Sequence, residues 1–166
     1  MAEAEFSGTY SHNIDSKGRV TIPSAYREAL GDRFTLGINN DFTALALYPE
    51  SQWKSISERL NRIPVSDAKG MRYVRMIKAF SYPNQETDSQ GRVLLPQLMR
   101  QKAGMDRSIC FVGVGRYLEI WDERRFMDET ARDEENFDAL LDYVNDRYFG
   151  KIEEAPADEN VHAQNA

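Results

Sequence analysis

The sequence predicts an α+β protein in which two copies of one short unit pair around a pseudo-two-fold axis to form a small β-barrel. A nine-residue motif occurs twice, with six identical positions and an offset of 73 residues. Short β-like segments separated by turn residues flank both motifs. A unit of roughly 45 residues is too small to bury a stable core alone. Pairing of the two copies therefore supplies a shared core.

The first copy, residues 8–52, has a pattern typical of short strands around one helix. A strand is predicted at residues 8–14, a turn at 15–18 and a second strand at 19–22. A helix follows at 23–30, and two further strands at 34–38 and 44–48. Pro23 suits the first position of the helix, and Gly31 suits its C-terminal cap. This segment therefore predicts one complete unit.

The second copy, residues 81–124, repeats the same order of elements at the constant offset. Residues 53–80 carry apolar side chains at helical spacing, which predicts a helical connector between the copies. Residues 125–149 predict a C-terminal amphipathic helix by the same pattern. Residues 150–166 contain almost no apolar side chains, so we expect a disordered acidic tail.

The charge is divided unevenly along the chain. The net charge of the whole sequence is -6, which at first argues against a nucleic-acid partner. Residues 1–126 hold 18 basic and 15 acidic side chains, a net of +3, whereas residues 127–166 hold 3 and 12, a net of -9. The acidity thus belongs to the C-terminal extension. A mildly basic main body permits DNA binding.

Composition and cysteine content indicate a soluble cytoplasmic protein with no membrane partner. The apolar stretches are far too short to span a membrane, and the N-terminal residues lack the basic segment and apolar core of a signal peptide. Cys110 is the single cysteine and sits in an apolar strand, as expected for an inert buried thiol. His12 has no neighbouring ligand at metal-binding spacing. We expect no metal site and no cofactor.

The repeated motif reads Asp-Ser-(Lys/Gln)-Gly-Arg-Val-x-x-Pro, and most of it has a structural explanation. Asp15 and Asp88 can accept hydrogen bonds from the next backbone N–H groups of a turn. Gly18 and Gly91 can supply the positive φ that closes a hairpin. Arg19 and Arg92 are different, because a hairpin does not require arginine after its glycine. An exposed ion pair with the aspartate stabilises by only about 0–1 kcal/mol. The recurrence of arginine in both copies therefore favours a functional role.

These residues resemble a known family. The two copies are similar to SpoVT-AbrB domains, the swapped-hairpin β-barrel of bacterial transcription factors and antitoxins. Their duplication, with Asp15-x-x-x-Arg19 and Asp88-x-x-x-Arg92, resembles the MraZ family over about residues 6–145. The similarity to this family also includes Arg27 and the sequences that end the two units, Leu-Tyr-Pro and Glu-Ile-Trp-Asp.

The resemblance implies a DNA-binding regulator of the division and cell-wall gene cluster that contains its own gene. It implies a ring of identical subunits, binding of double-stranded promoter DNA at short repeats, and association with the nucleoid. Arg19 and Arg92 carry over as DNA-binding residues, and Lys17 as a further contact. The counterpart of Lys17 is the uncharged Gln90, so we expect less electrostatic attraction from the second copy.

Two other classes of function remain as alternatives. An enzyme would have to use Asp15 and Asp88 as a carboxylate pair, but no phosphate-loop, dinucleotide or nucleophile-elbow motif accompanies them. We therefore expect no catalytic residues. An AbrB-type antitoxin or other interaction module would share the fold. Antitoxins of this type typically have one barrel unit followed by a toxin-binding tail, and two units argue against that reading.

Overall fold

The computed structural model describes residues 5–150 and divides the chain into two compact units. The main body is Met1–Met127, and the C-terminal unit is Asp128–Ala166. The predicted disordered tail lies outside the described residues, apart from Gly150. Each unit is described separately below.

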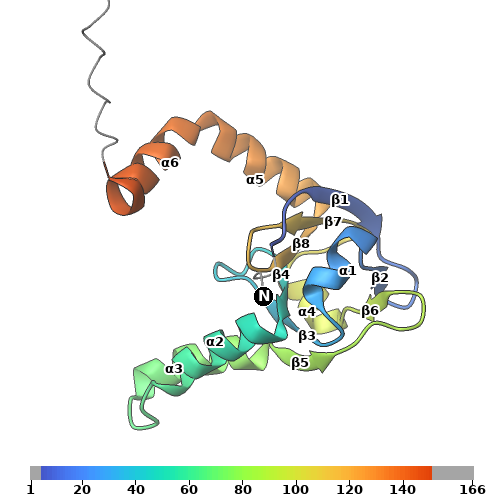
Figure 1. The fold of residues 1–166 in the computed structure, drawn as a ribbon, viewed down its shortest axis with the longest axis horizontal. Helices are drawn as coiled ribbons and strands as arrows, with labels where there is room; N and C mark the ends of the chain where they lie inside the picture. Colours follow the sequence, from blue (N-terminus) through green and yellow to red (C-terminus); the bar gives the residue numbers. More distant parts are fainter. Residues whose placement is uncertain (1–4, 151–166) are drawn as a thin grey trace, which may run out of the picture. The chain divides into compact units, whose positions relative to one another are not determined.

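The main body is α+β, as predicted, with mainly antiparallel strands (Figure 1). In chain order its elements are β1 (Thr9–Asn13), β2 (Arg19–Thr21), α1 (Ser24–Leu30), β3 (Phe34–Ile38), β4 (Leu45–Pro49), α2 (Glu50–Asn61), α3 (Ala68–Ala79), β5 (Tyr82–Gln85), β6 (Arg92–Leu94), α4 (Gln97–Lys102), β7 (Ser108–Gly113) and β8 (Leu118–Asp122). Helix α5 (Glu123–Glu135) begins in the main body and ends in the C-terminal unit.

The strands form two sheets, and no single closed barrel is present in the described part of the chain. Six strands pair in the order β1-β7-β8-β4-β3-β5, while β2 and β6 pair only with each other. The first strand of each copy pairs with the other copy, β1 with β7 and β5 with β3. When each strand is replaced by its equivalent in the other copy, the strand order of the large sheet is the same order read in reverse. The pairing is therefore pseudo-symmetric, and neither copy forms its sheet alone.

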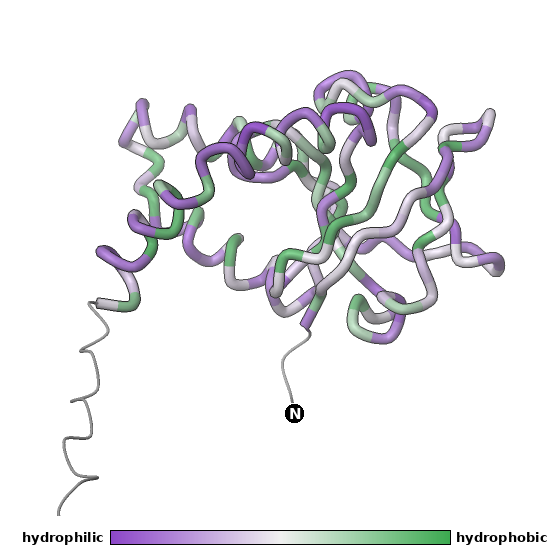
Figure 2. Tube along the Cα trace, turned by 90° about the horizontal axis from the view of Figure 1, so that it is seen from above, coloured by the Kyte–Doolittle hydropathy of each residue, from purple (hydrophilic) through white to green (hydrophobic). Residues whose placement is uncertain are grey.

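The core lies between the large sheet, the two-stranded sheet and the short helices α1 and α4. Its fully buried side chains come from both copies, including Phe6, Phe34, Leu47, Phe111 and Ile120. Figure 2 shows hydrophobic stretches along the strands and hydrophilic turns at their ends. This shared burial supplies what one unit of such length lacks.

Cys110 lies in β7 and is 1% exposed, packed with Ala44 and Trp121. Burial raises the pKa of its thiol to about 12, which keeps the sulfur protonated at neutral pH. The side chain therefore behaves as a small apolar core residue.

The C-terminal unit continues from α5 into α6 (Phe137–Val144) and a π-helical turn, η1 (Asn145–Phe149). Gly150 follows with a φ of 69°, a backbone conformation suited to ending a helix. Several large apolar side chains of this unit are exposed, among them Phe137, Leu140 and Leu141.

Candidate nucleic-acid interface

The two repeated motifs fold into two turns with the same hydrogen bonds. In the first, Asp15 Oδ1 accepts from the backbone N–H groups of Lys17 at 2.9 Å and Arg19 at 2.8 Å. In the second, Asp88 Oδ1 accepts from Gln90 and Arg92, both at 2.9 Å. Each aspartate thus satisfies donors of its own turn.

Glycine is required where each turn closes. Gly18 has a φ of 81° and Gly91 a φ of 74°, in the left-handed region that side chains with a Cβ rarely adopt. The N–H of each glycine donates at 3.0 Å to the carbonyl oxygen of the aspartate that begins its turn. The chain then enters β2 or β6 directly, with the motif arginine as the first strand residue.

The motif arginines are held by their own aspartates. Arg19 Nε lies 2.8 Å from Asp15 Oδ2, and Arg92 Nε lies 2.8 Å from Asp88 Oδ2. Their side chains are 29% and 26% exposed. Within residues 5–150, only the Nε of each guanidinium donates a hydrogen bond. The Nη groups can therefore donate to an anion or to base edges while the aspartate fixes the side chain.

Strands β2 and β6 bring the two turns together as one antiparallel ribbon. Val20 pairs with Val93, and both are buried at the centre. Arg19 pairs with Leu94 and Thr21 with Arg92, so the two arginines lie diagonally on the opposite face of the ribbon from the valines. Both turns project from the same side of the main body (Figure 1). A ribbon of two strands fits the width of the DNA major groove.

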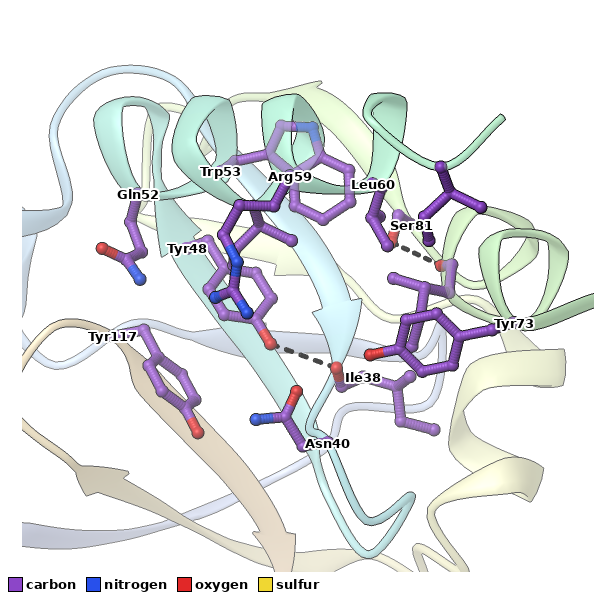
Figure 3. A pocket seen from close by; sticks show the side chains of 13 residues that line it. Ile38, Asn40, Tyr48, Gln52, Trp53, Arg59, Leu60, Tyr73, Ser81 and Tyr117 are labelled. Carbon is purple, nitrogen blue, oxygen red and sulfur yellow. Dashed lines mark hydrogen bonds between the residues drawn. The ribbon is translucent and has the colours of Figure 1, made fainter. Parts of the chain in front are cut away.

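A separate cavity of about 380 Å³ lies beside α2 and α3 (Figure 3). Its walls combine four aromatic side chains, Tyr48, Trp53, Tyr73 and Tyr117, with aliphatic and polar ones. Tyr48 Oη donates to the carbonyl oxygen of Ile38 at 3.1 Å. Burial raises the pKa of Tyr48 above its ordinary value, and it raises that of Tyr117 to about 12. None of the turn residues lines this cavity.

Comparison with known proteins identifies the family. The profile described as "MraZ protein, putative antitoxin-like" matches residues 6–75 and 83–147, so each matched segment contains one of the two turns. The chain belongs to the MraZ family. The match covers most of the chain in two segments, in agreement with the internal repeat.

Several MraZ relatives are similar along nearly their whole length. The chain is 38% identical over 144 residues to a protein named transcriptional regulator MraZ from Desulforamulus reducens, covering 85% of this chain and 98% of the relative. It is 35% identical over 141 residues to the protein of that name from Lachnoclostridium phytofermentans, covering 85% and 96%. A third, from Carboxydothermus hydrogenoformans, is 40% identical over 120 residues, covering 71% and 81%.

The structure adds two arginines to the motif residues of this MraZ chain. Arg27 on α1 and Arg100 on α4 each donate from Nε to a carbonyl oxygen of their own copy, Ile22 at 2.9 Å and Leu95 at 3.0 Å. The offset of 73 carries Arg27 onto Arg100 and Ile22 onto Leu95. The repeat therefore contained the signal for this pair, although sequence reasoning used only Arg27, and only as part of the family resemblance.

Two further features of the MraZ chain concern membranes and metals. None of the helices between residues 5 and 150 has the length and apolar character that crossing a membrane requires. Over the same residues, the His, Cys, Asp and Glu side chains form no group of three or more that could hold a metal ion.

We predict that both turn carboxyls of this MraZ protein titrate below their ordinary pKa of 3.8. Hydrogen bonds from the backbone N–H of Arg19 and Arg92 are the largest cause of the lower pKa of Asp15 and Asp88. The ionised carboxylates therefore stabilise the folded turns at pH values above the unfolded pKa. That contribution is lost as the pH falls through the folded pKa. Carbon-13 NMR titration of the carboxyl groups measures both values.

The Arg19→Ala variant provides the control for this titration. It retains the backbone N–H donors and removes only the guanidinium, so the pKa of Asp15 should rise part of the way towards 3.8. The pKa of Asp88 should not change. A pKa of 3.8 or above for either aspartate in the wild-type protein would contradict the hydrogen bonding described for the turns.

Proposed function

We propose that the protein is a sequence-specific, DNA-binding transcriptional regulator that acts on the division and cell-wall gene cluster containing its own gene. The observation that carries this proposal is the β2–β6 ribbon, with Arg19 and Arg92 on one face and a turn at each end. The names of the relatives support regulation of transcription. We place the two copies in the swapped-hairpin class, which the exchange of β1 and β5 between copies supports.

Each arginine offers a contact of suitable chemistry for double-stranded DNA. A guanidinium that donates two hydrogen bonds to the N7 and O6 atoms of guanine discriminates by about 1–3 kcal/mol. The Asp15 and Asp88 carboxylates limit the conformations of the arginine side chains, which reduces the entropy lost on binding. The two arginines of one ribbon would contact neighbouring positions of one DNA groove. The ribbons of neighbouring subunits would contact the other short repeats of the promoter DNA.

We further propose a ring-like homo-oligomer associated with the nucleoid. The exposed apolar side chains of α6, with Phe137, Leu140 and Leu141, support burial against another copy of the chain. Several subunits binding at once would multiply a modest affinity per subunit. This arrangement gives a function to a main body whose net charge is only mildly positive.

Binding to DNA from upstream of the gene tests the proposal directly. A gel-shift titration should give a retarded complex with this fragment at protein concentrations at least tenfold below those needed for a scrambled fragment of equal length. Light scattering on the same sample should give a mass of several subunits. Equal binding of both fragments would contradict sequence-specific regulation.

The antitoxin alternative keeps one supporting observation, the words "antitoxin-like" in the family description. An antitoxin would bind a toxin encoded beside it, whereas the proposed regulator lies beside division and cell-wall genes. Co-expression with any small neighbouring gene product, followed by purification of the complex, separates the two. A stable stoichiometric complex that neutralises a toxic neighbour would favour the antitoxin.

We predict that the two turns contribute unequally to DNA binding. Lys17 is exposed on the first turn, and the exposed Gln90 replaces it on the second. Lys17→Gln should reduce the slope of log K against log salt by about 0.9 for each bound subunit, because one phosphate contact is lost. Gln90→Lys should increase the slope by a similar amount. Fluorescence anisotropy across a salt series measures both.

Lys54→Gln serves as the matched control, because Lys54 is exposed on α2 and lies outside the two turns. Its salt slope should equal that of the wild type. An unchanged slope for Lys17→Gln would mean that Lys17 makes no phosphate contact.

A further inference from the structure

The two turns are not held by their own copies alone. The backbone N–H of Ile22 in the first copy donates to the carbonyl oxygen of Gly91 in the second at 2.9 Å. The backbone N–H of Leu95 donates to the carbonyl oxygen of Gly18 at the same distance. Each turn glycine is thus hydrogen-bonded to the strand end of the opposite copy.

Arg27 and Arg100 reinforce this exchange. The guanidinium of Arg27 covers Gly91 so closely that a methyl group at Gly91 would collide with its carbon atom. The guanidinium of Arg100 covers Gly18, where a methyl group would lie 3.1 Å from Nη2. Both glycines are buried, although they lie in turns. Each helix arginine therefore packs on the turn of the other copy.

The Nε hydrogen bond fixes the direction of each helix arginine. Arg27 Nε donates to Ile22, the same residue whose N–H binds Gly91, so one peptide segment positions both the arginine and the turn. Arg100, Leu95 and Gly18 form the equivalent set. Lysine cannot reproduce this arrangement, because it lacks both an Nε donor and a planar guanidinium.

We propose that Arg27 and Arg100 are positioning residues that act crosswise. Arg27 holds the second turn, and hence Arg92, whereas Arg100 holds the first turn, and hence Arg19. The two turns then form one rigid pair, whose spacing on DNA is set between the copies. The inference rests on the proposed DNA-binding function for its consequence, but the crosswise contact itself can be tested without DNA.

Amide hydrogen exchange in the absence of DNA tests the contact. In the Arg27→Lys variant, the amides of Gln90, Gly91 and Arg92 should exchange about fivefold faster or more, while those of the first turn change less than about twofold. Arg100→Lys should give the reverse pattern. Equal acceleration of both turns, or acceleration of the turn in the same copy, would overturn the proposal.

Double-mutant cycles on promoter binding test the consequence. Arg27→Lys should weaken binding about tenfold in the wild-type background but have almost no further effect in Arg92→Ala, because the side chain that it positions is gone. In the Arg19→Ala background, Arg27→Lys should still weaken promoter binding by the full tenfold. A general loss of structure would not distinguish the two backgrounds. Additivity of Arg27→Lys with Arg92→Ala would overturn the positioning role.

The salt dependence separates positioning from direct phosphate contact. A positioning role requires that Arg27→Lys and Arg27→Gln weaken binding similarly with the salt slope unchanged. A direct phosphate contact would give a different result: Arg27→Lys would bind like the wild type, and Arg27→Gln would have a salt slope reduced by about 0.9. That result would overturn the proposal.

If circular dichroism shows that the Arg27 variants are unfolded, the Arg100 variants decide all three experiments, with Arg19→Ala as the coupled background. If the wild type binds no promoter DNA, the proposed function fails while the exchange result still decides the crosswise contact.

Discussion

Replacement of Arg19 and Arg92 together by alanine is expected to abolish specific promoter binding. Each arginine is anchored by its aspartate on the exposed face of the ribbon, with Nε engaged and Nη groups open to a ligand. A lost guanine contact costs about 1–3 kcal/mol, which is roughly five- to 150-fold in Kd for each arginine. The losses multiply over the subunits of an oligomer. Gel-shift and anisotropy titrations measure the effect.

A charge-matched control distinguishes this result from general electrostatics. Arg72→Ala, Arg75→Ala also removes two positive charges, but from helix α3. That variant should retain specific binding with at most a small loss of affinity. Circular dichroism and oligomer size should match the wild type for both double variants. Wild-type promoter affinity of the Arg19→Ala, Arg92→Ala variant would refute the assignment of these arginines to the site.

Truncation of Phe111 is expected to have the largest effect on stability. This side chain is fully buried in β7, whose strand pairs with β1 on one side and β8 on the other. Phe111→Ala should lower the free energy of unfolding by about 3–5 kcal/mol, because it removes apolar burial and leaves a cavity where both copies meet. Urea unfolding at fixed protein concentration, followed by circular dichroism, measures the change.

Phe149→Ala is the matched control, since this phenylalanine is 70% exposed in η1. Its free energy of unfolding should lie within about 0.5 kcal/mol of the wild type. A loss below about 1 kcal/mol for Phe111→Ala would indicate that the two copies do not share a core at this position.

Local features of the site could be predicted from the sequence, because they depend on neighbouring residues. The position of the turns followed from aspartate and glycine three residues apart, and the family followed from the duplicated motif. The ion pairs could be considered but not decided, because Arg19 can point either to Asp15 or away from it. The structure shows the bond at 2.8 Å in both copies.

Long-range pairing could not be predicted at the same level. The sequence led to a single small barrel, whereas the structure has a six-stranded sheet and a separate ribbon. Strands β2 and β6 have only three residues each, and each of them pairs only with the other. Strand patterns identify which face is buried, but they do not identify the partner strand.

The sequence by itself determined the turn chemistry, the arginine motif and the α+β class, because these depend on residues close together in the chain, and it determined the repeat by direct comparison of two segments 73 residues apart. Only the tertiary structure decided that Val20 meets Val93 and that Arg27 covers Gly91. Those contacts join residues that are far apart in sequence, and they form only where packing of both copies brings the segments together. The physical reason is that a short unit cannot bury its apolar face alone, so the other copy supplies both the core and the support of each turn.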